Sequence, residues 1–303
     1  METARCKAFV ASVKTGSFSG AAEQLNYTTS GVSQLVTALE KDLNLTLFRR
    51  SRKGVTLTAD GERIYPVILN FLRQEERIYQ TADEISGLFV GEISIAAYPS
   101  ICASWLPDMM IRFQKLHPGV SFKINDDGVR RHIIEELHSG RADIGFMSDH
   151  HDLAGEWIEL EKNPMLALVS LDSPYAQWES FPLKECQTAT MIECVHGKNP
   201  DLSYIFADHR IEPNIVYTTL TSSTATAMAS RNMGVFITNE LSTHMWDFPV
   251  KGLPLDPPQY VALGMAVSPM SYGSPVVKAF VRFFRKEFND SRDKSLRSVA
   301  SDL

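Results

Sequence analysis

A strict seven-residue repeat constrains the fold of this chain more than any other feature of its sequence. Between residues 64 and 89, eight positions follow one another at alternating intervals of four and three residues, and seven of them are apolar. This spacing predicts one long helix that packs along a partner helix, with the single polar member fixing the register. A helix packed on its own domain is the alternative. The eight positions are Ile64, Ile68, Phe71, Glu75, Ile78, Ala82, Ile85 and Phe89.

The predicted helix separates a basic N-terminal part from an acidic C-terminal part. Residues 1–65 contain nine Lys or Arg and six Asp or Glu, whereas residues 66–303 contain 21 and 30. The net charge of −6 therefore hides a positively charged head. Four of the five residues from Arg49 to Lys53 are cationic, which indicates contact with phosphate, although a solvated basic loop is the alternative.

Length and composition exclude several classes of protein. A chain of 303 residues exceeds what one hydrophobic core usually organises, so we expect two or three domains. No apolar run approaches the roughly 20 residues of a membrane helix, and the N-terminus has no continuous apolar signal-peptide core. The four cysteines form no CxxC pair. We therefore expect a cytoplasmic protein with reduced thiols.

Three short helices are predicted before the repeat. The first covers about residues 3–14. A second begins after Ser17, a good N-cap, and ends at Asn26, which suits a left-handed C-terminal position. Thr28 can cap a third helix, whose apolar stripe has helical spacing. The stripe consists of Val32, Val36, Leu39 and Leu43.

The start of this third helix has an uncharged polar face. Its side chains are short enough to meet base edges in a major groove, and they are Thr29, Ser30, Ser33, Gln34 and Thr37. Solvation of an exposed helix is the alternative. Downstream, an extended run, the basic turn RRSRKG and a second extended run predict a β-hairpin wing, which favours the DNA-reading interpretation. Arg52 and Lys53 in that turn could lie along phosphates or enter a minor groove.

Several motifs follow one another in order over about sixty residues. GSF precedes the second helix, AA-x-x-L lies within it, S-x-x-V-x-x-LE lies in the third helix, and LF-x-R, GV-x-LT and a final Gly form the wing. In these motifs the chain resembles the winged helix-turn-helix head of LysR-type transcriptional regulators. The resemblance implies that Thr28 contacts phosphate and Lys53 the minor groove. The complete predicted DNA-binding set is Thr28, Thr29, Ser30, Ser33, Gln34, Thr37, Arg50, Arg52 and Lys53.

Strands alternate with helices after Gly87 and Gly91, which we expect to end the long helix. The β-rich runs include EISIAAY, ADIGFM and GVFIT, and helical patterns such as RRHIIEELHSG lie between them. This alternation predicts parallel sheets covered on both faces, which bind ligands beyond the carboxyl ends of their strands.

The resemblance to LysR-type regulators extends more loosely over this part, through GEISIAAYPSICASWLPDMMIRFQKLHPGVSFKI and ELHSGRADIGFM. It implies a multidomain protein, with an all-α winged helix-turn-helix domain, a long linker helix and a two-lobed α/β effector domain like a periplasmic binding protein. The chain would cross between the lobes near Lys162 and Val267. The expected boundaries are 1–58 for the head, 59–90 for the linker and 91–303 for the effector domain, with lobe I at 91–163 and 268–303 and lobe II at 164–267.

The strand-to-helix loops of this body are rich in hydroxyl groups. Hydroxyls and backbone N–H groups at helix starts suit a carboxylate or a similar anion, although ordinary helix capping is the alternative. We find no basic cluster in these loops, so the ligand need not be strongly anionic. The predicted effector-binding residues are Ser100, Cys102, Gly128, Ser148, Thr219 and Ser222.

The sequence gives no sign of catalysis. His150, His151 and Asp152 are adjacent, so their side chains diverge, and we expect a solvated loop and no metal site. Cys186 and Cys194 are expected to be inert and not a redox pair. There is no Gly-rich phosphate loop, nucleophile elbow or paired-carboxylate motif. We therefore expect neither an enzyme nor a bound cofactor.

Together these features predict a sequence-specific transcription regulator whose promoter binding is modulated by a small-molecule effector in a cleft between the lobes. The expected partners are double-stranded promoter DNA, the effector and further copies of the chain, as a dimer through the linker helix or as a tetramer. Two alternatives are a solute-binding or catalytic α/β body that carries a basic appendage, and a regulator whose cleft is empty.

Overall fold

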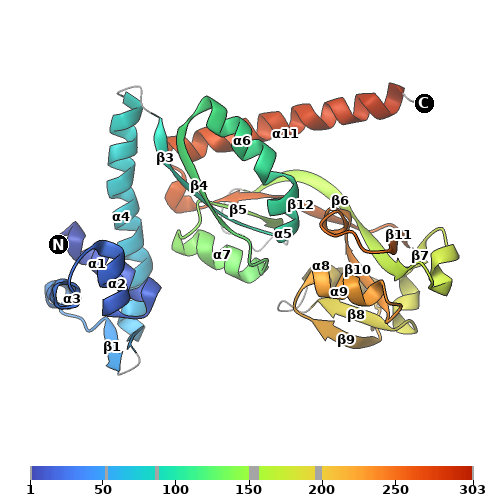
Figure 1. Cartoon of the computed structure of the whole chain (residues 1–303), viewed down its shortest axis with the longest axis horizontal. Helices are drawn as coiled ribbons and strands as arrows, with labels where there is room; N and C mark the ends of the chain where they lie inside the picture. Colours follow the sequence, from blue (N-terminus) through green and yellow to red (C-terminus); the bar gives the residue numbers. More distant parts are fainter. Residues whose placement is uncertain (1, 52–53, 86–88, 150–156, 195–199, 302–303) are drawn as a thin grey trace. The chain divides into compact units, whose positions relative to one another are not determined.

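The computed structural model of the chain describes residues 2–51, 54–85, 89–149, 157–194 and 200–301. These residues form two compact units (Figure 1). The first unit extends to Phe89 and includes the short segment Gly273–Pro275, and the second contains Val90–Tyr272 and the residues from Val276 onward. Within the described ranges, no helix combines the length and the apolar character needed to cross a bilayer.

The first unit begins with the three helices expected from the sequence. Ser17 accepts a hydrogen bond from the Gly20 N–H at 3.1 Å, and Asn26 has the left-handed φ of 56°, so the predicted start and end of the second helix are confirmed. Thr28 caps the third helix by accepting from the Gly31 N–H at 3.1 Å. The elements of this unit are α1 (Thr3–Thr15), α2 (Phe18–Leu25), α3 (Thr29–Leu43), β1 (Phe48–Ser51), β2 (Gly54–Leu57) and α4 (Ala59–Ile85).

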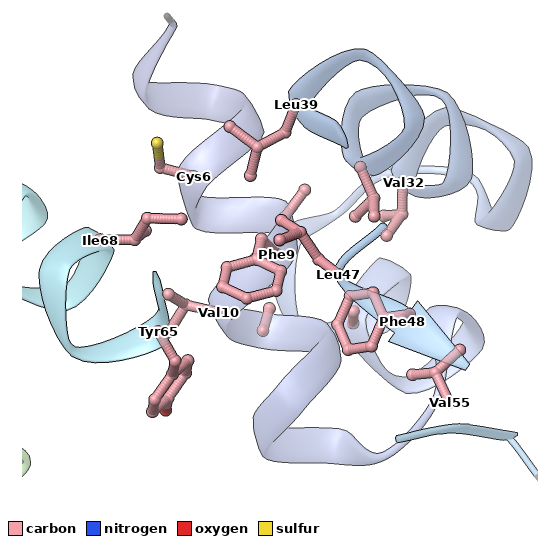
Figure 2. Packing of buried hydrophobic residues seen from close by; sticks show 14 of the residues in the cluster. Cys6, Phe9, Val10, Val32, Leu39, Leu47, Phe48, Val55, Tyr65 and Ile68 are labelled. Carbon is pink, nitrogen blue, oxygen red and sulfur yellow. The ribbon is translucent and has the colours of Figure 1, made fainter. Parts of the chain in front are cut away.

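A single apolar core joins these elements. Figure 2 shows Phe9 of α1 at its centre, with its ring centroid 5.2 Å from that of Phe48 and 6.1 Å from that of Tyr65. Tyr65 and Ile68 belong to α4, so the start of the long helix completes the core of the head. The predicted α3 stripe is confirmed, because Val32, Val36 and Leu39 are fully buried and Leu43 is partly buried.

The wing is an antiparallel hairpin of β1 and β2, as predicted. Its second strand begins at Gly54. This position favours glycine because its φ of 126° is one that residues with a side chain rarely adopt. A Cβ at this residue would lie 2.2 Å from the carbonyl oxygen of Gly16. The adjacent Val55 N–H donates to that same oxygen at 2.8 Å, which fastens the wing to the end of α1. Arg52 and Lys53 lie outside the described residues.

The seven-residue repeat on α4 divides into two parts. Ile64 and Ile68 pack into the head, and the Glu75 carboxylate forms an ion pair with Lys7 of α1 at 3.2 Å. In contrast, Ile78 is 69% exposed and Ile85 is 82% exposed. The prediction that the whole stripe meets a partner helix is therefore wrong for its first turns, which the head itself covers.

The second unit is built on strands that belong to two sheets. One sheet holds β3, β4, β5, β12 and the first half of β6, and the other holds β8, β9, β10, β11 and the second half of β6. The strands are β3 (Val90–Ala97), β4 (Gly119–Asn125), β5 (Ile144–Ser148), β6 (Trp157–Ser170), β7 (Phe181–Pro182), β8 (Met191–Cys194), β9 (Ile215–Thr219), β10 (Val235–Asn239), β11 (Val250–Asp256) and β12 (Tyr260–Val267).

Helices lie between most of these strands. The α-helices are α5 (Pro99–Ser104), α6 (Leu106–Leu116), α7 (Arg130–Ser139), α8 (Pro200–His209), α9 (Ser222–Ala229), α10 (Glu240–Thr243) and α11 (Pro275–Ser301). Short 3₁₀ turns cover Pro174–Gln177, Leu183–Gln187 and Pro269–Ser271.

The sheets are mixed, whereas the sequence analysis predicted parallel sheets. Parallel ladders join β4, β3 and β5 in one sheet and β10, β8 and β9 in the other. β12 runs antiparallel to β5 and β6, and β6 runs antiparallel to β10 and β11. The reason is that β6 leaves the first sheet for the second and β12 returns, so the two strands run in opposite directions side by side.

The structure differs from the sequence-based expectation at the second crossing between the sheets and at the end of the long helix. β12 already pairs with β5 at Leu263, so the return to the first sheet falls between Asp256 and Leu263 and not near Val267. Gly91 lies inside β3 and does not end the long helix, and Gly87 lies outside the described residues.

Aromatic side chains of the last helix complete the core on the first sheet. Phe280 of α11 lies 5.1 Å from Phe113 between ring centroids, and Phe284 lies 5.0 Å from Phe146. Trp105 meets Phe288 at 4.8 Å. The core of the first sheet therefore depends on residues from the far end of the chain.

Candidate functional site

The polar face of α3 reaches solvent on the side of the helix opposite the core. Thr29, Ser30, Gln34 and Thr37 are exposed and Ser33 is half-buried. Because the apolar stripe turns toward α1, this face is the part of the helix that a ligand could approach in the first unit. All five side chains are uncharged hydrogen-bonding groups, which can read base edges.

The hydroxyl group of Thr28 holds the first turn of α3 through hydrogen bonds with a backbone N–H group and a neighbouring hydroxyl. Thr28 Oγ1 accepts from the Gly31 N–H and lies 3.1 Å from Ser30 Oγ. These bonds fix the N-terminal end of the helix, where backbone N–H groups favour a phosphate. Thr28, to which the resemblance assigns a phosphate contact, is the N-cap residue of this helix.

Arg50 joins the wing to this polar face. Its guanidinium donates to Ser33 Oγ at 3.4 Å, to Thr37 Oγ1 at 3.1 Å and to Glu40 Oε2 at 3.3 Å. The same group lies 5.1 Å above the ring of Phe18. The four contacts hold the Arg50 side chain along α3.

Glu40 links the network to the backbone of the wing. Its Oε1 accepts from the N–H groups of Leu47 at 2.8 Å and Phe48 at 3.2 Å. The sequence analysis noted the LE of α3 only as part of a motif and missed this role. The signal that could have found it is the opposite charge of Glu40, near the end of the helix, and Arg50 of LF-x-R.

A pocket of about 620 Å³ lies in the second unit and is lined by residues from both of its sheets. From the first sheet and its helices it receives Tyr98, Pro99, Ser100, Asp126, Asp127, Gly128, Arg130, Arg131 and Ile134. From the second it receives Cys194, Asp201, Leu220, Thr221, Ser222, Ser223, Phe236, Thr238, Asn239, Ser242, Met245 and Trp246. A small molecule bound here would therefore touch both lobes.

Three of the six predicted effector-binding residues line this pocket, namely Ser100, Gly128 and Ser222. Gly128 has a φ of 76°, and a Cβ there would lie 2.8 Å from Cδ of Pro99. The close approach of these two loops therefore requires glycine at this position.

Cys102, Ser148 and Thr219 are not among the lining residues. Ser148 is fully buried, and its hydroxyl lies 2.9 Å from the hydroxyl of Tyr98, which does line the pocket. Thr219 is the last residue of β9, and the wall begins one residue later at Leu220. Cys102 is half-buried on α5.

Charged side chains in the pocket are the main feature that the sequence analysis missed. Arg130 is only 9% exposed, and its Nε donates to the Ser148 carbonyl oxygen at 3.1 Å. Arg131 and Asp201 also line the cavity. The sequence analysis found no basic cluster in the strand-to-helix loops, but it did not consider that both arginines, at the start of α7, would reach the pocket.

Burial keeps the Tyr98 hydroxyl in its neutral form. Desolvation raises the pKa of Tyr98 well above its usual value, and the Asp201 carboxylate raises it further. The hydrogen bond with Ser148 and the charge of Arg130 act in the opposite direction and are smaller. Tyr98 is therefore a neutral hydrogen-bonding group in the pocket wall.

The four cysteines are free thiols. Burial raises the pKa of the Cys186 thiol to about 12, and that of Cys102 to about 12. The thiolate is the reactive form, so both groups are poor nucleophiles near neutral pH. In the described part of the chain, no three His, Cys, Asp or Glu side chains are placed to hold a metal ion, and His150, His151 and Asp152 lie outside it.

Two family models match the chain. The bacterial regulatory helix-turn-helix protein of the lysR family matches residues 4–62, and the LysR substrate binding domain matches residues 86–289.

Full-length relatives agree with these matches. The uncharacterized HTH-type transcriptional regulator YvbU of Bacillus subtilis is 27% identical over 95% of this chain and 99% of its own length. The transcriptional activator protein LysR of Escherichia coli is 25% identical over 90% of this chain and 84% of its own length. Among solved structures, a full-length OxyR variant from Pseudomonas aeruginosa has a TM-score of 0.74 at 17% identity, covering 94% of this chain and 98% of its own.

The second of these models alone spans more than half of the chain, and the helix-turn-helix model covers the head that precedes it. The relatives are regulators and not enzymes. The chain therefore belongs to the LysR family of transcriptional regulators, with a helix-turn-helix DNA-binding head and an effector-binding domain.

Proposed function

We propose that this regulator reads promoter DNA with the polar face of α3 and contacts phosphates with the cap of that helix and with the wing. The DNA-binding residues in this proposal are Thr28, Thr29, Ser30, Ser33, Gln34, Thr37, Arg50, Arg52 and Lys53. The main support for this proposal is the orientation of α3. The helix buries its apolar stripe, while its uncharged polar side chains remain accessible to solvent beside a cationic wing.

In this proposal the head and the linker helix have different roles. The head comprises 1–58 and the linker helix 59–90. The exposed second half of the linker helix, with Ile78 and Ile85, pairs with the same helix of a second copy. A dimer suits DNA reading because two recognition helices about 34 Å apart can address half-sites one turn apart. The site of action is the cytoplasm, where the promoter is found.

The effector domain, 91–303, binds a small molecule in the pocket of about 620 Å³. Ser100, Gly128 and Ser222 lie in its wall, and Arg130 adds a buried positive charge. The two lobes can adopt more than one arrangement relative to each other. A ligand that contacts both sheets binds one arrangement more tightly, and it therefore shifts the equilibrium toward that arrangement. The change in lobe arrangement is transmitted through the linker helix to the DNA-binding heads, and it thereby changes their affinity for the promoter.

A gel shift with a promoter fragment tests the reading face. We expect Gln34→Ala to weaken specific binding by about tenfold, because one base contact contributes about 1–3 kcal/mol. Binding of both proteins should fall steeply with salt as counterions are released. The matched control is Gln24→Ala, the same substitution at an exposed residue of α2. Equal affinities for Gln34→Ala and the control would count against this face.

A further inference from the structure

The contacts of Arg50 with α3 have a fixed hydrogen-bond direction. The guanidinium has five N–H donors and no acceptor. In its bonds to Ser33 Oγ and Thr37 Oγ1, the hydroxyl oxygens therefore accept. Each hydroxyl keeps its own hydrogen for another partner.

The hydrogens of these two hydroxyls have no protein acceptor among the hydrogen bonds of the described residues. Hydroxyls elsewhere in the head behave differently. On α1, Ser12 donates to the Ala8 carbonyl oxygen at 2.7 Å, and Thr15 donates to that of Ala11 at 2.9 Å. The two α3 hydroxyls make no such bond and direct their hydrogens to solvent or to a bound molecule.

Arg50 is itself restrained. The Glu40 carboxylate accepts from its guanidinium and is in turn held by the Leu47 and Phe48 N–H groups. The ring of Phe18 covers one face of the guanidinium at 5.1 Å. The donor group is thus preorganised before any DNA arrives.

We propose that Arg50 is a positioning residue that sets the hydrogen-bond polarity of the reading face. Because Arg50 engages one of the two lone pairs on each oxygen, the hydroxyls of Ser33 and Thr37 act preferentially as donors toward the major groove. They favour acceptor edges, such as guanine O6 and N7 or thymine O4, and they disfavour cytosine, whose edge offers only an amino donor. This inference rests on the proposed function, because it assumes that α3 faces the bases.

Selection of bound duplexes from a randomised DNA pool by the full-length protein tests this polarity. Ser33→Ala and Thr37→Val identify the base pairs that the hydroxyls meet, as the positions where preference is lost. At those positions, cytosine on the contacted strand should be about five- to tenfold rarer among the duplexes that the unmodified protein selects than in the starting pool. Arg50→Gln, whose amide can accept as well as donate, should abolish that exclusion at the same positions and no others.

Two further variants separate polarity from charge and from folding. Arg50→Lys keeps donors without an acceptor and should retain the exclusion of cytosine. Arg49→Met removes a neighbouring exposed charge on β1 and should lower affinity without changing base preference. Thermal unfolding of each variant shows whether the head remains folded, and a loss of stability alone would not change preference at chosen positions.

The outcomes are distinguishable. If Ser33→Ala and Thr37→Val alter preference while Arg50→Gln leaves every preference intact, the polarity role of Arg50 is refuted and the reading face stands. If neither hydroxyl variant alters any position, the proposed face of α3 itself fails at these residues.

Discussion

At the scale of single residues, burial of a thiol makes stability depend on alkaline pH. Cys186 is fully buried, and burial raises its pKa from 9.0 to about 12. Between these values the unfolded chain has lost the proton and the folded chain still holds it, so the free energy of unfolding falls as pH rises. We expect a contribution to this slope of up to about 1.4 kcal/mol per pH unit.

Urea unfolding between pH 8 and 11 measures this slope. Cys186→Ala should be less stable than the unmodified protein at pH 8, because it leaves a small cavity, but its stability should fall less steeply as pH rises. If the free energy of unfolding falls equally with pH in the two proteins, the Cys186 thiol does not cause the pH dependence.

Single residues also show what the sequence could and could not predict. Ser17, Asn26 and Thr28 were assigned correctly as caps because capping depends on neighbours within three residues. Arg130 was missed because its place in the pocket depends on a contact with Ser148, eighteen residues away. The correctly predicted lining residues, Ser100, Gly128 and Ser222, all lie within two residues of a helix start. The predictions failed where packing decides which side chain reaches the pocket.

At the scale of elements, the junction between α4 and the head depends on close backbone approach at Gly61. A Cβ there would lie 2.3 Å from the Leu47 carbonyl oxygen. We expect Gly61→Ala to destabilise the head by about 1–3 kcal/mol through overpacking, although alanine gains about 1 kcal/mol in helix propensity. Urea unfolding followed by circular dichroism measures the change. Glu62→Ala, at the next, exposed residue, should stay within about 0.5 kcal/mol.

The order of helices and strands could be predicted, but strand direction could not. The composition of the β-rich runs located the strands of the body. It carries no information on whether neighbours run parallel, and β6 and β12 run antiparallel because the chain passes between the sheets twice. Likewise, the repeat on α4 predicted a helix, while the contact of Ile68 with the head decided which turns remain free.

At the scale of the whole molecule, the uncovered turns of α4 predict how copies associate. Ile78 is 69% exposed on the apolar stripe. We expect Ile78→Glu to place like charges together in the proposed dimer and to shift it to monomers, with loss of high-affinity promoter binding. Sedimentation velocity measures the mass. Gln74→Glu adds the same charge on α4 outside the stripe and should leave the mass unchanged. A dimer that survives Ile78→Glu would contradict this pairing.

The dependence of the first sheet on α11 has a consequence for protein synthesis. Phe280, Phe284 and Phe288 are translated long after Trp105, Phe113 and Phe146, whose core they complete. The apolar core of the head, among the described residues, uses none beyond Leu72 of α4, so this core can form while most of the chain is still untranslated. Translation that stops between α4 and α11 would therefore leave a folded core in the head beside an effector domain whose first sheet lacks part of its core.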